Sequence, residues 1–447
     1  METLTNKMGF TKDQQKAMSI AIYIFVTANV MYMITGNVRA YIGLDYPDVK
    51  ETLVTSLITL PNLMNLIVGV IIGPIAARYN KIVLLIIARA CFLIFTMLMF
   101  INGVMHGPFW IYIVACMFCG VNLGSFGPLV NSIVGEIFEE KNRANKISAY
   151  NVWVNIGGVI LLQATGIIAA HNDGAGWSYA YLMGLWTIVA TVGFLVVLRK
   201  TGYKDDKATR AKRLELQNKV IEEEMAHGDS TVFTSMGKVW SFVIVTSLVH
   251  CVFYIGINAY YLTVSNYIIT EHELGTSAQA GTANSLVRAA LVVIQLTYPL
   301  WFRLLKDWTL PVGYAITGIG LIFALKFDSS LFGIYACAAC AGISTALVHA
   351  AFYSKGLNYV PRKYVSVAAA LNWGIANSGA FIATYVYTAV CGPMLETENG
   401  IASWLKTGMF IMAAVVAVSA VLYIFMFPEV KNRNKRLQRE AEEKTEG

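Results

Sequence analysis

Arg288 lies near the middle of an apolar stretch that runs from about residue 278 to residue 302. A charged side chain at the centre of a membrane helix costs roughly 2.5–3.5 kcal/mol, so it needs a wet cavity and a partner. No Asp or Glu lies at mid-depth in this or any other apolar stretch. A guanidinium binds carboxylate or phosphate through two parallel hydrogen bonds. Arg288 therefore predicts a site for an anionic ligand, with pairing to backbone carbonyls as the alternative.

Two further arginines fall inside apolar stretches and allow different interpretations. Arg39, near one end of the first stretch, fits either a second anion contact that draws anions inward or an anchor whose partner is Asp45 or Asp48. Arg89 lies near one end of its stretch, and a structural role with Glu136 as its partner is the stronger hypothesis.

Two histidines, His250 and His349, also lie inside apolar stretches. Neutral imidazole titrates near physiological pH, so each is a candidate for proton coupling. A hydrogen-bonded packing role is the alternative and the commoner one. At helical spacing one face of the first of these stretches carries four polar or aromatic side chains: His250, Tyr254, Asn258 and Tyr261.

Amides and aromatic side chains recur in several neighbouring stretches. Buried amides and phenols need hydrogen-bond partners, which are either other helices or a ligand. We expect part of this set to hold the polar body of a ligand while Arg288 holds its charge. The predicted binding residues are Arg39, Asn155, His250, Tyr254, Asn258, Tyr261, Arg288, Gln295, Asn372, Trp373 and Asn377.

The elements that position these residues are predicted to be membrane helices. The chain of 447 residues is 56% hydrophobic and 14% charged, against about 25% charged residues in a soluble domain. A window of about 19 residues divides it into twelve apolar stretches, each long enough to span a bilayer. The fold class that follows is an all-α polytopic membrane protein with twelve transmembrane helices. The net charge of +7 favours membrane lipids over nucleic acid as the charged partner, because basic residues flank the stretches.

The distribution of basic residues predicts the topology. Twenty-eight of the 34 Lys and Arg residues fall in the two ends of the chain and in every second connection between stretches. Positive connections stay in the cytoplasm. Both termini are therefore expected to be cytoplasmic, in a plasma (inner) membrane, and the polar first residues resemble no cleaved signal peptide.

The chain is predicted to consist of two six-helix bundles that repeat one another. The expected parts are an N-terminal bundle at 1–198, a cytoplasmic linker at 199–238, a C-terminal bundle at 239–427 and a charged tail at 428–447. A shift of 221 residues superimposes several positions of the halves, among them Cys116 on Cys337, Cys119 on Cys340, Asn151 on Asn372, and Gly158 on Gly379. Such matched halves indicate parallel repeats about an axis along the membrane normal.

The connection after the second stretch resembles a signature of the major facilitator superfamily. Residues 73–81 read Gly-Pro-Ile-Ala-Ala-Arg-Tyr-Asn-Lys, with Ala77 where the family usually carries Asp. The resemblance covers nearly the whole chain and implies a secondary transporter that works by alternating access. It also implies gating roles for Gly73, Arg78, Lys81, Glu136 and Arg143.

The function expected from these residues is secondary active transport of a small organic anion, most simply a carboxylate, by a monomer. The sequence is distantly similar to the oxalate–formate exchanger branch, which shares the arginine in helix 8 but has a lysine in helix 11, where this chain has amides. The alternative is a neutral solute, a sugar or drug-like compound, with possible proton coupling through His250.

Enzyme chemistry is excluded because we find no nucleophile, paired carboxylates or metal cluster at one depth. No phosphate-binding loop of the ATPase type is present. The seven cysteines lie in or beside apolar stretches and are expected to be free apolar side chains, so no metal or cofactor is predicted.

Overall fold

The structure is a computed structural model that describes residues 10–138, 140–206, 211, 236–305, 308–355, 360, 362–397 and 399–422. All regular elements in these ranges are helical. In the N-terminal half they are α1 (Lys12–Thr27), η1 (Ala28–Met33), α2 (Ile34–Asp45), α3 (Glu51–Arg78), α4 (Lys81–Met105), α5 (Trp110–Ile137), α6 (Glu140–Ala169), η2 (His171–Gly174), η3 (Trp177–Leu185) and α7 (Trp186–Lys200).

The C-terminal half repeats the pattern of long helices joined by short connections. It consists of α9 (Met236–Asn266), the π-helical turn η4 (Tyr267–Glu271), α10 (Ser277–Leu305), α11 (Thr309–Lys326), α12 (Leu331–Lys355), α13 (Arg362–Cys391) and α14 (Gly400–Val421). Within the described ranges, eleven helical segments are long and apolar enough to cross a membrane. The helix α13 has a comparable length but is not one of these eleven segments, and its sequence contains the polar residues Asn372 and Asn377. The predicted fold class, a multi-pass all-α membrane protein, is confirmed.

The first predicted span is not one straight helix. It consists of α1, the 3₁₀ segment η1 and α2. Gly157 of α6 packs against this break, because a Cβ at Gly157 would lie 2.6 Å from the carbonyl oxygen of Thr27. The break brings Met33, at the end of η1, to the Arg288 site described below.

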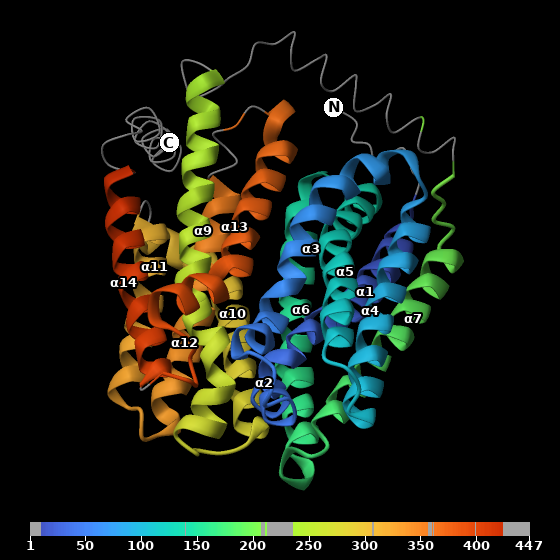
Figure 1. Cartoon of the computed structure of the whole chain (residues 1–447). Helices are drawn as coiled ribbons and strands as arrows, with labels where there is room; N and C mark the ends of the chain where they lie inside the picture. The colour runs from blue at the N-terminus through green and yellow to red at the C-terminus, as the bar shows by residue number, and fades with distance from the viewer. Residues whose placement is uncertain are drawn as a thin grey trace.

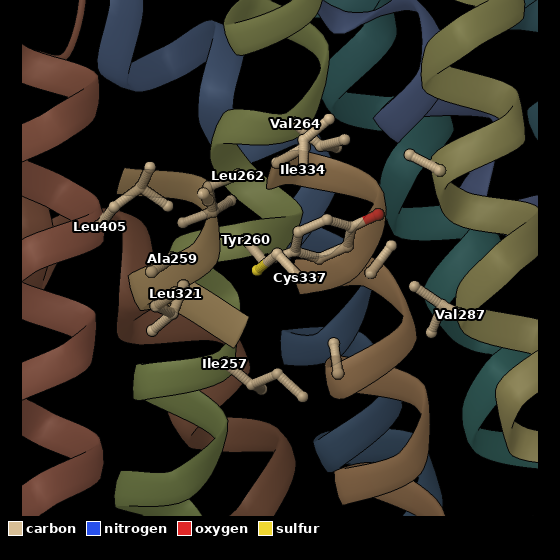
Figure 2. Close-up of a cluster of buried hydrophobic side chains, with 14 of the residues drawn as sticks. Ile257, Ala259, Tyr260, Leu262, Val264, Val287, Leu321, Ile334, Cys337 and Leu405 are labelled. Carbon is tan, nitrogen blue, oxygen red and sulfur yellow. The ribbon is translucent and has the colours of Figure 1, made fainter. Parts of the chain in front are cut away.

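The two halves gather on opposite sides of the molecule, with α3–α7 on one side and α9 and α11–α14 on the other (Figure 1). Each half has its own buried apolar cluster. In the C-terminal half Tyr260 of α9 lies among Ile334 and Cys337 of α12 and Leu321 of α11 (Figure 2). The expected limits of the linker at 199 and 238 lie close to the end of α7 and the start of α9, whereas most of the linker and the whole tail at 428–447 lie outside the described residues. The division into these parts stays a prediction.

Contacts between the halves gather at one end of the molecule. The chain enters α1 and leaves α14 at the same end, which we call the terminal end, and the two groups of helices draw together toward the other end (Figure 1). From that opposite end a ladder of hydrogen bonds joins α3 to α13: Thr52–Thr388 at 3.5 Å, Thr59–Thr384 at 3.2 Å and Asn65–Asn377 at 3.2 Å. Asn284 of α10 also donates to Asn37 of α2 at 2.7 Å.

Candidate functional site

Arg288 lies halfway along α10 and faces the N-terminal half. Its Nη1 donates to Oδ1 of Asn155 on α6 at 3.0 Å, and Nη2 contacts the sulfur of Met33. The stem of the side chain packs on Gly158, where a Cβ would lie 2.8 Å from Arg288 Cγ. Its Nε is buried and has no hydrogen-bond partner among the described residues. The guanidinium is therefore held by neutral groups and keeps unused donor capacity.

Asn155 connects Arg288 to a second amide on α10. While its oxygen accepts from Arg288, its Nδ2 donates to Oε1 of Gln295 at 3.2 Å and to the backbone oxygen of Asn151 at 3.0 Å. Gln295 lies two helical turns after Arg288, so both side chains share one face of α10. Three of the predicted binding residues thus form one hydrogen-bonded group between α6 and α10.

A second polar group lies within the C-terminal half. His250 of α9 donates from Nδ1 to Oδ1 of Asn372 at 3.1 Å, because the Asn372 amide nitrogen donates to Ser247 at 3.1 Å and this fixes which amide atom faces the imidazole. The imidazole of His250 therefore carries its proton on Nδ1, and Nε2 is the atom that can accept one.

His349 of α12 joins the same group through Tyr254. The tyrosine hydroxyl and His349 Nε2 are 2.8 Å apart, and the two imidazole rings of His250 and His349 have centroids 5.5 Å apart. The indole of Trp373 lies edge-on to His349 at 5.9 Å and is 36% exposed. The structure thus brings together both proton-coupling candidates and two of the predicted aromatic binding residues.

The remaining predicted binding residues divide between helix packing and the site. Asn258 donates to the Tyr254 carbonyl at 2.6 Å, and Asn377 donates to the Trp373 carbonyl at 2.7 Å while accepting from Asn65. These amides form hydrogen bonds within and between helices, which is the alternative that the sequence left open. Tyr261 is half-buried and interacts electrostatically with Arg288.

Arg39 has an internal counter-ion, and the expected partners Asp45 and Asp48 are wrong. Its Nη2 lies 2.8 Å from Oε1 of Glu51, at the start of α3, and also contacts Thr55. Asp45 instead accepts from the indole nitrogen of Trp177 at 2.6 Å. Because this ion pair is buried, Arg39 does not present a free charge to the Arg288 site.

Sequence reasoning missed Glu51, which links the two halves. Its second oxygen accepts from the backbone N–H of Leu395, in the connection between α13 and α14, at 2.7 Å. The available signal was its position: Glu51 is a carboxylate at the first turn of a predicted span, at the same end of the molecule as Arg39.

Arg89 occupies an aromatic pocket. Its guanidinium carbon lies 4.5 Å from the ring centre of Phe25 and 4.0 Å from that of Phe126, and Nη2 donates to the Phe25 carbonyl at 3.3 Å. The structural role expected for Arg89 agrees with these contacts. The side chain of its expected partner, Glu136, lies outside the described part of the structure.

The predicted gating residues are described only in part. Arg78 is exposed, whereas Lys81 is buried and donates from Nζ to Ser132 of α5 at 2.5 Å. The structure describes neither the surroundings of Gly73 nor the side chains of Glu136 and Arg143.

A carboxylate from the start of the linker reaches the beginning of α4. Oδ2 of Asp205 accepts from the backbone N–H of Lys81 at 2.6 Å, and the Asp205 carbonyl accepts from the Asn80 side chain at 3.0 Å. Asn80 itself caps the helix through Ile82 and Val83. An acidic group at a helix N-terminus is stabilising, so Asp205 fixes the chain just after α7 to the start of α4.

Two helical halves that close on each other at one end, with a polar group between them at mid-depth, define a membrane transporter rather than an enzyme. The chain belongs to the Major Facilitator Superfamily, whose sequence profile matches residues 17–384. Comparison with curated protein sequences gives no match.

Solved structures of peptide transporters share the fold. A POT family transporter in complex with 5-aminolevulinic acid is 12% identical, with a TM-score of 0.69 over 93% of this chain and 96% of that one. The peptide transporter POT in complex with sulfate is 13% identical, with a TM-score of 0.67 over 91% and 94%. Tetrameric PepTSo2 is 12% identical, with a TM-score of 0.67 over 96% and 100%. At these identities the likeness establishes the architecture and leaves the substrate open.

Proposed function

We propose that this transporter moves a small organic anion, most simply a carboxylate, with Arg288 as the contact for its charge. The observation that carries the proposal is the guanidinium on α10, which has only neutral partners among the described residues. Arg288 is partly buried, and a cation in a membrane helix without a counter-ion is costly, so a bound carboxylate would reduce that cost. Asn155 and Gln295 would hold the guanidinium in place for it.

Alternating access would expose this site first on one side of the membrane and then on the other. The halves would rock about the site, with 1–198 and 239–427 as the two moving bundles, 199–238 as their linker and 428–447 as the tail. The hydrogen-bond ladder between α3 and α13 supports a state closed at the opposite end. If the termini are cytoplasmic in the plasma membrane, as the charge distribution predicts, this state faces the cytoplasm.

Binding by the purified monomer tests the proposal most directly. We would measure thermal stabilisation by acetate, succinate and 3-phenylpropanoate, since a ligand stabilises by RT ln(1 + [L]/Kd). Arg288→Ala should abolish the thermal stabilisation. Arg288→Lys should keep only a small part of it, because an ammonium group lacks the planar pair of donors. Lys406→Ala, at an exposed position on α14, is the matched control and should bind as the wild type does. Stabilisation that survives Arg288→Ala would refute the proposal.

A neutral solute moved with protons is the second candidate, and the group around His250 favours it. His250, Tyr254 and His349 form one polar group, and imidazole side chains can accept and pass on protons near physiological pH. Uptake into liposomes containing a pH-sensitive dye separates the two functions. We would measure proton entry that accompanies uptake of a neutral sugar. If this proton entry is lost in His250→Gln and kept in Arg288→Ala, the second function is established in place of the first.

A further inference from the structure

The chain offers a ligand a cation at mid-depth but no carboxylate. Among the residues that the structure describes, every Asp and Glu lies at a helix end or in a connection. Long parts of the sequence hold neither residue: 14–44, 52–135, 141–172, 174–204, 230–270, 274–306, 308–327, 329–395 and 399–428. Glu51, the carboxylate buried at the opposite end, is already bound to Arg39 and Leu395. An ammonium group on a ligand would therefore meet no opposite charge near Arg288.

Three amide oxygens of these polar groups already accept from the protein's own donors. Asn155 Oδ1 accepts from Arg288, Gln295 Oε1 accepts from Asn155, and Asn372 Oδ1 accepts from His250. Each of these oxygens has one of its two lone pairs occupied, so an ammonium group could use only the remaining one and would compete with the protein's own donor. It would also lie close to the guanidinium, and two like charges repel strongly where water is scarce.

Aromatic side chains gather around His349 in the C-terminal half. Tyr254 stacks on His349 with centroids 6.0 Å apart, and the partly exposed Trp373 lies edge-on to the same imidazole. His349 in turn lies within electrostatic reach of Arg288. Such rings favour a flat apolar body beside the charged group of a ligand.

We propose that the ligand is an acid with an aromatic body and no ammonium group, so that amino acids and peptides are rejected. This inference rests on the proposed function and narrows it, because it concerns the substrate class of the same Arg288 site. It separates this chain from the peptide transporters whose fold it shares. The ammonium charge is the expected cause of rejection, because an aromatic acid and the matching aromatic amino acid share the ring and the carboxylate and differ in the ammonium group.

Four probes with one phenyl ring test the inference on the purified full-length chain. They are 3-phenylpropanoate, L-phenylalanine, 2-phenylethylamine and 3-phenylpropanamide, which differ in charge and little in shape. We expect 3-phenylpropanoate to bind at least about tenfold more tightly than each of the others, measured as thermal stabilisation and as competition for uptake. Aromatic rings also attract cations, which is why the amine is included.

Each outcome decides something different. Arg288-dependent binding of phenylalanine equal to that of the acid overturns the inference and leaves the organic-anion function standing. Equal binding of the amide or the amine that survives Arg288→Ala overturns both. If none of the four binds, the inference falls, and acetate and succinate decide the organic-anion function separately.

A charge variant provides a second test. Gln295→Glu keeps the oxygen that accepts from Asn155 and adds the missing carboxylate two turns from Arg288. It should reduce the preference for 3-phenylpropanoate over phenylalanine from tenfold or more to below about threefold. Gln295→Leu removes the amide without adding charge, so a preference that falls equally in both variants would show that charge is not the cause.

Discussion

Arg39 and Arg288 show the same side chain in two environments of one transporter. Arg39 lies near the opposite end, is 1% exposed and is neutralised by Glu51 at 2.8 Å. Arg288 lies at mid-depth between the halves, where an amide and a thioether are its partners. The buried Arg39 has its own carboxylate and needs no ligand, whereas the partly buried Arg288 is held by neutral groups and can accept an anion.

The largest effect should come from removing the internal counter-ion. Glu51→Ala leaves Arg39 buried and unpaired, and breaking a buried pair costs about 3–5 kcal/mol. Denaturant or thermal unfolding in detergent measures the loss in free energy of unfolding. Asp48→Ala, the exposed carboxylate nearby, is the control and should stay within about 0.5 kcal/mol of the wild type. If Glu51→Ala and Asp48→Ala lower the free energy of unfolding equally, Glu51 is not a special counter-ion for Arg39, and the contrast with Arg288 fails.

The reverse change gives Arg288 an internal carboxylate partner, as Arg39 has in Glu51. Asn155→Asp places a carboxylate at the atom that now accepts from Arg288 at 3.0 Å. We expect binding of 3-phenylpropanoate to weaken by about 2 kcal/mol, roughly thirtyfold, because the ligand then competes with an internal anion. Asn151→Asp adds the same charge one turn away on α6 as the control. Undiminished binding in Asn155→Asp would show that the guanidinium is not the anion contact.

Position, as distinct from charge, is tested at Gly158. The Cβ introduced by Gly158→Ala would lie 2.8 Å from Arg288 Cγ, so the arginine stem must move. Overpacking of this kind costs about 1–2 kcal/mol, which we expect to appear as weaker ligand binding with the charge unchanged. Gly193→Ala on α7 is the control, because nothing lies within 4 Å of its new Cβ. A shift in affinity common to both variants would point to a general helix effect.

The smallest effect is expected in the ladder that closes the opposite end. Thr59→Val removes one buried hydrogen bond to Thr384, worth about 0.5–1.5 kcal/mol, and should shift the equilibrium toward opening by up to about tenfold. Spin labels at Asp48 and Glu396, one on each half, report the separation. Thr297→Val, whose hydroxyl bonds to its own helix, should leave the distance distribution unchanged. A wild-type distribution in Thr59→Val would mean that this bond does not hold the halves together.

The hydropathy pattern predicted the helices well because a bilayer leaves few alternatives for the backbone. Arg288 was identified from the sequence because a lone charge in an apolar stretch is visible without knowing its neighbours. Partners from distant helices were not: the phenyl pocket of Arg89 is built by Phe25 and Phe126, and Lys81 meets Asp205 from the linker. The break at η1 was also missed, since Ala28–Met33 is as apolar as the helices around it.

The two carboxylate oxygens of Glu51 have partners in different halves of the transporter. One holds Arg39, which belongs to the same half, and the other accepts a backbone N–H from Leu395 of the other half. Parting of the halves would therefore exchange one neutral donor for water, while the ion pair travels intact. In the alternating-access cycle proposed above, this buried pair of charges would then never be separated, and only the hydrogen bond to Leu395 would be lost.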